Sequence, residues 1–292
     1  MVSQLIINIL INFCIYVLIA FSFVLIYSTS KFFNIAHAAV ISVGAYLTYF
    51  FFSQLALSIW LSVPFAIFLT ILVGSFFELF IYKPLRRKNT SSLKLLIVSL
   101  GIYIIIQNCI SIFWGDATKI IKIEEIKVGN EILGMYITNV QIIIIIVCFL
   151  IYFLNLFFLK YHKLGKNIRA VASNAELANI MGVNSDKIIL FSFIIGSGIA
   201  AISGILIASD TGLTPTMGFN LLLYGIVAMI IGGVGSKWGL IFGAFLLALS
   251  QNLIAYYIDS KWMDAITYII MIVFLIWKPL GFSGNKMKKI DI

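Results

Sequence analysis

LIINILINFCIYVLIAFSFVLIY, residues 5–27, contains no charged side chain. A helix needs about 20 predominantly apolar residues to cross the hydrocarbon core of a bilayer, and this run meets that length. No Lys or Arg precedes the run, and it is longer than the apolar centre of a secretory signal peptide. We therefore expect a membrane-spanning helix that is retained in the protein.

The composition of the whole chain continues this pattern. Of the 292 residues, 62% are apolar and 11% are charged, whereas an average soluble domain is about half apolar and about a quarter charged. So few charges cannot cover a water-exposed surface, which excludes an ordinary soluble protein and disfavours nucleic acid as the reason for the net charge of +9. The three cysteines lie singly in apolar runs without a C-x-x-C pair, so we predict no disulfide framework, no metal site and no cofactor.

Apolar runs of spanning length recur along the chain, at residues 57–82, 95–114, 137–159 and 188–208. Four further runs contain polar residues, are short or are rich in glycine, at residues 32–52, 221–233, 238–255 and 264–277. We therefore predict an all-α, polytopic membrane protein with about nine transmembrane helices, within a range of eight to ten. Because no long polar segment separates the runs, residues 1–292 are expected to form a single transmembrane domain.

The distribution of Lys and Arg predicts the orientation of the chain, because short loops rich in these residues stay on the cytoplasmic side. They gather at residues 83–94, 160–187 and 278–289, with Lys31 and Lys237 alone. All five positions fall on one side only if the chain starts outside, crosses nine times and ends inside. We therefore expect an external N-terminus, a cytoplasmic C-terminus, and a basic cytoplasmic face that meets lipid headgroups and partner proteins.

The predicted outer loop at residues 115–136 has a different pattern. Charged and β-branched residues alternate around Gly129 and Gly134, which predicts a short hairpin. The composition of the loop indicates no function.

Two stretches interrupt the apolar runs, and they enter the membrane from opposite sides. One is STSKFFNIAHAA at residues 28–39, and the other spans residues 211–239 and contains GLTPTMG and IGGVGSKWG. Unwound backbone at membrane depth survives only beside protein or water, so such a pair favours a translocation path and an inverted repeat. The path candidates are Asn34, His37, Gly212, Thr214, Gly232, Gly233 and Gly235. For each glycine, helix packing or a turn is the alternative.

Three polar side chains in or near the predicted spans need separate explanations. Asn34 and His37 are three residues apart, so on a helix they share a face that could line a path or bond a neighbouring helix. For His37 alone we favour a hydrogen-bonded packing role over proton transfer. Glu78 is the sole carboxylate well within a predicted span. We expect it to have a local partner rather than to bind a coupling ion, because Tyr82 and Lys83 place it near the interface.

The longest predicted cytoplasmic loop, residues 160–187, contains signals for a short helix. Asn174 can cap a helix that begins at Ala175 and ends near Gly182. That helix would expose three apolar side chains, those of Leu177, Ile180 and Met181. It could dock into a groove on another protein, or it could lie on the headgroups beside basic residues such as Arg169.

The sequence contains no nucleotide-binding motif, because GGVGSKWG lacks the G-x-x-x-x-G-K-[ST] order of a phosphate loop. It also lacks a Ser, His and Asp set or paired carboxylates within the spans. We therefore predict a transporter component and no enzyme.

The stretch KLGKNIRAVASNAELANIMGVNSDKIILFSFIIGSGIAAISG, residues 163–204, resembles the cytoplasmic coupling segment and following span of the permease subunits of branched-chain amino-acid ABC importers. Within it, Glu176, Leu177 and Ala178 followed by Gly182 are similar to the E-A-A-x-x-x-G coupling pattern, with Leu177 in place of the first Ala. NIAHA at residues 34–38 is similar to the family's N-F-A-H-G, with Ala38 in place of the Gly. IGGVGSKWGLIFGA at residues 231–244 continues the resemblance.

This resemblance implies a multi-pass permease of the bacterial inner membrane that translocates Leu, Ile or Val. Its partners would be a second homologous permease in a heterodimer, two ATP-binding subunits beneath, an extracytoplasmic solute-binding protein, and the lipid bilayer. The resemblance implies that five residues couple the permease to the ATPases, namely Arg169, Asn174, Glu176, Ala178 and Gly182. Two alternatives remain: an ABC permease for another small solute (urea or an amide, a nucleoside or a sugar), and a self-sufficient channel or ion-coupled carrier that uses Glu78 and His37.

Overall fold

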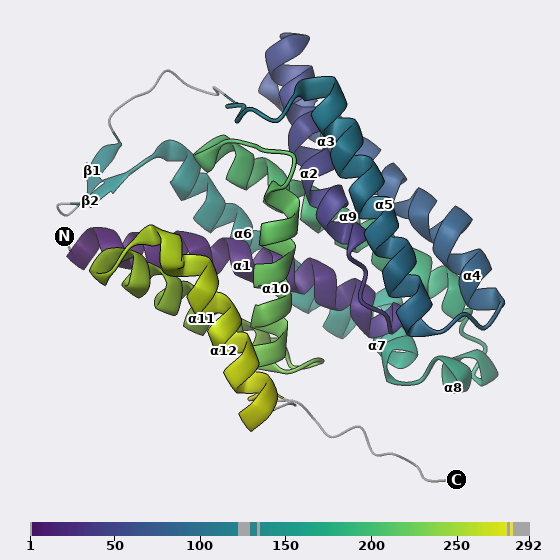
Figure 1. Cartoon of the computed structure of the whole chain (residues 1–292). Helices are drawn as coiled ribbons and strands as arrows, with labels where there is room; N and C mark the ends of the chain where they lie inside the picture. The colour runs from purple at the N-terminus through teal and green to yellow at the C-terminus, as the bar shows by residue number, and fades with distance from the viewer. Residues whose placement is uncertain (1, 122–128, 133–134, 279–280, 283–292) are drawn as a thin grey trace.

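The computed structural model describes residues 2–121, 129–132, 135–278 and 281–282. These residues form a helical bundle with one small hairpin (Figure 1). The α-helices are α1 Val2–Ser30, α2 Ala36–Tyr49, α3 Ile59–Phe76, α4 Lys83–Arg87, α5 Ser92–Trp114, α6 Asn139–Tyr161, α7 Lys163–Ser173, α8 Ala175–Ile180, α9 Ser185–Thr211, α10 Met217–Gly232, α11 Lys237–Tyr257 and α12 Met263–Trp277. Two π-helical segments are η1 Phe50–Gln54 and η2 Phe77–Tyr82, η3 Ser260–Trp262 is a 3-10 turn, and the strands are β1 Asn130–Ile132 and β2 Met135–Ile137.

The helices confirm the predicted class of an all-α, polytopic membrane protein. In the described part of the chain, eight helical stretches are long and apolar enough to cross a membrane, and α10 is a shorter apolar helix. Eight long helices and one short helix fall within the predicted range of eight to ten. The longest of the predicted runs continues beyond its expected end, because α3, η2 and α4 form one stretch, Ile59–Arg87.

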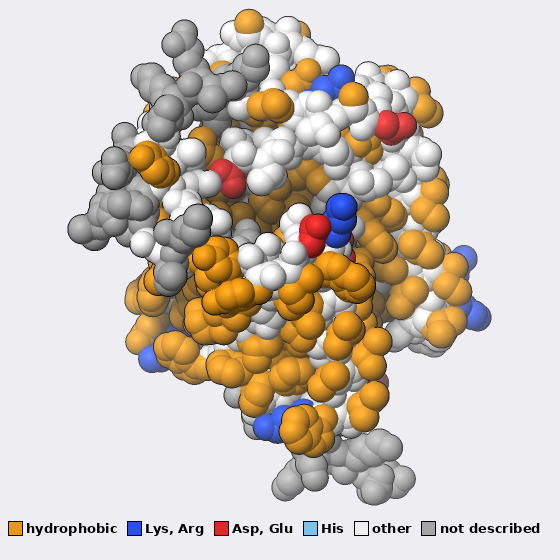
Figure 2. All heavy atoms as spheres, turned by 60° about the vertical axis from the view of Figure 1, so that its left-hand side comes forward, with side chains coloured by type: hydrophobic (Ala, Val, Ile, Leu, Met, Phe, Trp, Pro, Cys, Tyr) orange, Lys and Arg blue, Asp and Glu red, His pale blue; other side chains and the backbone are white. Residues whose placement is uncertain are grey.

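The bundle has central and peripheral helices. The spanning parts of α1 and α9 are mostly buried, whereas those of α3, α5, α6 and α12 are mostly exposed. The central helices α1, α2, α9, α10 and α11 pack against one another. Figure 2 shows a broad apolar surface with few charged side chains on one face of the molecule. Such a surface is stable in hydrocarbon, where apolar side chains do not have to be buried away from water.

The predicted hairpin in residues 115–136 is present. β1 and β2 pair antiparallel, with Asn130 opposite Ile137, while Gly134 and its neighbour at 133 lie outside the described residues. The backbone of Tyr136 exchanges two hydrogen bonds of 3.1 Å with the side chain of Gln4 near the start of α1. The hairpin and the N-terminus therefore share one end of the bundle, and α7 and α8 lie at the other (Figure 1).

This arrangement agrees with the predicted separation of the outer loop from residues 160–187. Which end faces the cytoplasm stays a prediction. The orientation prediction depends in part on three lysines that lie outside the described residues, Lys286, Lys288 and Lys289.

Candidate functional site

The first interrupted stretch meets the beginning of the second within the bundle. The first contains the break between α1 and α2, and the second starts at the turn between α9 and α10; α1 and α2 each pack against both α9 and α10. Two glycines allow the close approach. A Cβ added to Gly204 would lie 2.2 Å from the carbonyl oxygen of Ile41, and one added to Gly218 would lie 2.1 Å from that of Ala38. Where the family pattern has Gly and this chain has Ala38, the space for the crossing comes from Gly218 on the opposite helix.

A serine in the middle of α2 bonds the start of α10. The backbone N–H of Gly218 donates to Ser42 Oγ at 3.1 Å, and Ser42 Oγ donates to the carbonyl of Pro215 at 3.5 Å. Thr214, a predicted path residue, precedes Pro215, is half-buried, and accepts through its carbonyl from the N–H of Met217 at 3.1 Å. The N-terminal end of α10 therefore packs against the first half of α2 within the bundle.

The break before α2 holds the predicted path residue Asn34, whose side chain is buried. The Tyr82 hydroxyl donates to Asn34 Oδ1 at 2.9 Å, and the N–H of Ile35 donates to Ser99 Oγ at 3.0 Å. Lys31 begins the break with a φ of 59°. Ser99 of α5 thus satisfies a backbone group that a continuous helix would have satisfied itself, and Tyr82 of η2 satisfies the buried side chain of Asn34.

His37, the second polar residue of this stretch, is buried and has one occupied ring nitrogen. His37 Nε2 lies 2.9 Å from Ser22 Oγ, and that hydroxyl donates its only hydrogen to the carbonyl of Ile19 at 2.8 Å. When the Ser22 hydroxyl donates to Ile19, it accepts from His37, and in that tautomer the imidazole hydrogen is on Nε2 and Nδ1 is an acceptor. Nδ1 has no hydrogen-bond partner among the described residues. The predicted packing role explains Nε2, whereas it leaves the buried Nδ1 without an explanation.

Gly212 ends α9 with a φ of 90°, a conformation that only glycine adopts without strain. The next residue, Leu213, is buried and forms an isolated antiparallel bridge with Lys119, with hydrogen bonds of 3.0 and 2.8 Å. The loop after α5 is thus fastened across the turn that leads into α10.

The remaining three path candidates lie at the opposite end of α10. A Cβ added to Gly232 would lie 2.2 Å from the carbonyl oxygen of Gly239, so the pair allows α10 and α11 to cross closely. Gly233 and Gly235 have φ values of 90° and 91° in the turn between these helices. The packing and turn alternative accounts for all three positions, and the structure does not bring them to His37.

The predicted coupling segment, residues 160–187, contains the predicted capped helix. Asn174 Oδ1 accepts from the N–H of Leu177 at 3.0 Å, α8 starts at Ala175, and Gly182 follows its end with a φ of 85°. The exposed fractions of Leu177, Ile180 and Met181 are 59%, 80% and 83%. Ala178 is the buried residue of α8, whereas Arg169 and Glu176 are exposed. A polar surface depression of about 480 Å³ lies beside α8, lined by Asn179, Gly182, Val183, Asn184, Ser185 and Asp186.

Glu78 has the local partner that its position predicts. Its side chain is fully buried in η2, and its Oε1 lies 2.6 Å from Nη2 of Arg86. Among the described residues, no group of three His, Cys, Asp or Glu side chains could hold a metal ion. A carboxylate neutralised by its own arginine is not a free site for a coupling ion.

Two contacts were not predicted from the sequence. Arg86 also reaches Asp186, which is 100 positions away, and Lys31 Nζ donates to the carbonyl of Ala172 in the last turn of α7. The helix α7 itself was also missed, although Gly165, Ile168 and Val171 are buried at the i, i+3 spacing of one helix face. That spacing was the available signal.

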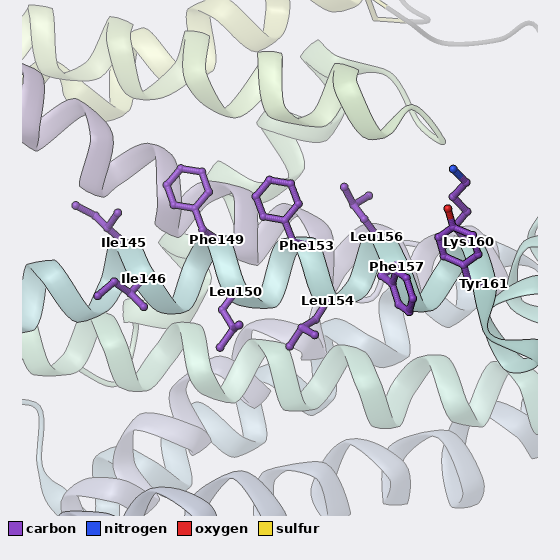
Figure 3. Close-up of a pocket in the computed structure, with 10 residues that line it drawn as sticks. All are labelled: Ile145, Ile146, Phe149, Leu150, Phe153, Leu154, Leu156, Phe157, Lys160 and Tyr161. Atoms are coloured by element: carbon purple, nitrogen blue, oxygen red, sulfur yellow. The ribbon is translucent and has the colours of Figure 1, made fainter.

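An apolar depression of about 850 Å³ is separate from these residues. It follows the outer face of α6 (Figure 3), is wide open, and ends at Lys160 and Tyr161. It contains none of the predicted path residues, so it belongs to the exposed apolar surface of the bundle.

The fold and these sites define a polytopic helical membrane transporter component. Residues 5–275 match the family model described as branched-chain amino acid transport system / permease component, and the chain belongs to this family. It is 28% identical to the high-affinity branched-chain amino acid transport system permease protein LivH of Escherichia coli K12, over 92% of this chain and 91% of that protein. It is 29% identical to the corresponding permease protein BraD of Pseudomonas aeruginosa, over 92% of each. No solved structure matches the chain. The chain is a multi-pass protein of the bacterial inner membrane.

Proposed function

We propose that this chain is the permease subunit of an ABC importer that translocates branched-chain amino acids. In this proposal an extracytoplasmic binding protein delivers Leu, Ile or Val, two separate ATP-binding subunits drive transport, and a second homologous permease completes a heterodimer. Membership of the permease family and the similarity to LivH and BraD over nearly the whole chain support it. The N-terminus would lie outside and the C-terminus in the cytoplasm.

The observation that carries the coupling role is the exposed apolar tip of α8. Leu177, Ile180 and Met181 point out of a helix that is capped at both ends, and the polar depression lies beside them. Apolar side chains held out on a short cytoplasmic helix are suited to a groove on another protein. In this role Asn174, Ala178 and Gly182 hold the helix in place, and Arg169 and Glu176 offer charges to the partner.

The proposed translocation path passes the starts of α2 and α10. The two interrupted stretches contain four of the path residues, Asn34, His37, Gly212 and Thr214. In many transporters, buried helix ends face the substrate path. His37 Nδ1 would accept a hydrogen bond from the α-ammonium group of the amino acid. ATP-driven closure of the partner subunits would move α8 and tilt the spans, which opens the path alternately to each side. Gly232, Gly233 and Gly235 would contribute the moving turn between α10 and α11.

The test is purification of the chain together with its co-encoded subunits and reconstitution in vesicles. We expect binding protein loaded with leucine, isoleucine or valine to stimulate ATP hydrolysis and to deliver the amino acid into the vesicles. Stimulation only by a sugar, a nucleoside, urea or an amide would refute the substrate. Uptake by vesicles that hold the chain without ATP-binding subunits would instead support a channel or carrier.

A further inference from the structure

A series of ion pairs joins the coupling segment to the end of the helical stretch Ile59–Arg87. Arg86 Nη2 lies 2.6 Å from Glu78 Oε1 and 3.3 Å from Asp186 Oδ1, and Arg87 Nη2 lies 3.0 Å from Asp186 Oδ2. Asp186 is in the first turn of α9, at the end of the predicted coupling segment (residues 160–187), and it lines the depression beside α8. One guanidinium therefore holds a buried carboxylate and a carboxylate of the cytoplasmic loop at the same time.

The two arginines differ in their exposure and in the number of carboxylates that each one bonds. The side chain of Arg86 is 22% exposed and bonds both carboxylates, whereas that of Arg87 is 67% exposed and bonds Asp186. An exposed ion pair is screened by water and is worth little. A partly buried guanidinium that bonds two carboxylates in a fixed geometry holds both firmly, which a lysine could not do as well.

The buried end of this series of ion pairs, at Glu78, is connected to the proposed path. Glu78 and Tyr82 are four residues apart in η2, and Tyr82 is the side chain that donates to Asn34. The Tyr82 ring is fully buried against Phe32, with ring centroids 4.9 Å apart. The π-helical geometry of η2 is rare and occurs frequently at functional sites. A displacement of Glu78 would therefore be passed to the break that carries Asn34.

A second contact connects the break before α2 to the coupling segment through Lys31. Lys31, at the start of the same break, donates through Nζ to the carbonyl of Ala172 at the end of α7, and its own carbonyl accepts from Ser92 Oγ at 3.3 Å. The break thus touches the coupling segment directly through Lys31 and indirectly through Tyr82, η2 and Arg86.

We propose that Arg86 is a positioning residue that transmits the movement of the coupling segment, through Asp186, to Glu78 and the break at Asn34. This inference rests on the proposed function, because only a permease driven by ATP-binding subunits has such a movement to transmit. The link is a physical contact between α4 and α9. Its strength is the coupling free energy between the coupling segment and the break at Asn34, which can be measured.

The experiment uses the complete importer in vesicles and measures leucine taken up per ATP hydrolysed. Asp186→Ala severs the link and leaves the buried Glu78 and Arg86 pair intact. The double variant Glu78→Gln, Arg86→Gln severs it without leaving an unpaired charge in the membrane. Arg87→Gln is the matched control, because it removes an arginine from the same carboxylate but leaves Arg86 in place.

We expect Asp186→Ala and the double variant to assemble and hydrolyse ATP while uptake per ATP falls about tenfold. Arg87→Gln should stay within about threefold of the unmodified importer. Wild-type uptake per ATP in Asp186→Ala, or an equal loss in Arg87→Gln, would overturn the role of Arg86. If the unmodified importer shows neither leucine uptake nor hydrolysis stimulated by the loaded binding protein, the proposed function falls, and this inference falls with it.

Discussion

The hydroxyl of Tyr82 and the amide oxygen of Asn34 form a buried hydrogen bond of 2.9 Å between residues 48 positions apart. This contact fastens the end of the third spanning stretch to the break between α1 and α2. It therefore connects the two features that the proposed mechanism requires, an interrupted helix at the path and a helix end tied to the cytoplasmic loop.

Tyr82→Phe should weaken the break, because it leaves the oxygen of Asn34 buried without its donor. We expect the free energy of unfolding in detergent to fall by about 1–3 kcal/mol and leucine uptake to fall with it. Thermal unfolding of the purified permease measures the first effect. Tyr161→Phe, at an exposed tyrosine of α6, is the control and should change neither quantity. Equal stability of Tyr82→Phe and the unmodified protein would contradict this prediction.

His37→Gln and His37→Asn separate the two ring nitrogens. The Gln amide nitrogen can replace Nε2–H in its bond to Ser22, but the variant has no acceptor at the position of Nδ1. The Asn oxygen lies near the position of Nδ1, but the bond to Ser22 is lost. We expect His37→Gln to fold normally and to lower leucine uptake about tenfold, the worth of a hydrogen bond to a charged group.

His37→Asn should instead be less stable while keeping more of its uptake per folded molecule. Uptake assays and thermal unfolding on the same preparations distinguish the two variants. Full uptake by His37→Gln would mean that packing is the whole role of His37.

Gly182→Pro should uncouple transport from ATP hydrolysis. The φ of 85° at Gly182 cannot be adopted by proline, whose ring fixes φ near −65°, and proline also lacks the N–H that donates to Asn179 at 3.0 Å. We expect α8 to be displaced while the importer still inserts and hydrolyses ATP. The ratio of uptake to hydrolysis measures the effect, and an unchanged ratio would refute the coupling role of this turn. Gly182→Ala should give a milder loss, because a Cβ there meets open space and only the backbone is strained.

Ile180→Ser should weaken the association with the ATP-binding subunits without destabilising the permease. Its side chain is 80% exposed, so the folded chain loses little packing. A central apolar contact in an interface is often worth enough that its loss lowers affinity about tenfold or more. Titration of the ATP-binding subunit onto the purified permease measures this affinity. Ile258→Ser, at an exposed residue between α11 and η3, is the control. Equal affinities for the two variants would argue that α8 lies on the membrane instead.

Gly232→Ala tests whether this glycine serves packing or the path. The added methyl would meet the carbonyl of Gly239 at 2.2 Å, so α10 and α11 would have to separate. We expect a loss of about 1–3 kcal/mol in the free energy of unfolding. Gly101→Ala, where a Cβ has nothing within 4 Å, should be neutral or slightly stabilising. Normal stability with lost uptake in Gly232→Ala would favour the path.

Much of the fold and of the coupling segment could be predicted from the sequence because the signals are local. The length and apolar character of a run decide whether a helix can span a bilayer, whatever its neighbours are. The ends of α8 follow from the side-chain cap at Asn174 and the left-handed backbone at Gly182, which involve only a few consecutive residues. The break near Asn34 was also predictable, since polar residues interrupt an apolar run there.

The tertiary structure alone decided which distant groups meet. Asp186 and Arg86 are 100 positions apart and Ser22 faces His37 from another helix, so no spacing in the sequence encodes either pair. These contacts depend on the rotation of each helix about its axis, which is fixed only when all the helices pack together. The sequence by itself therefore determined a helical membrane permease with a capped helix in the segment proposed for coupling. The packed bundle decided how that helix is connected to the proposed path.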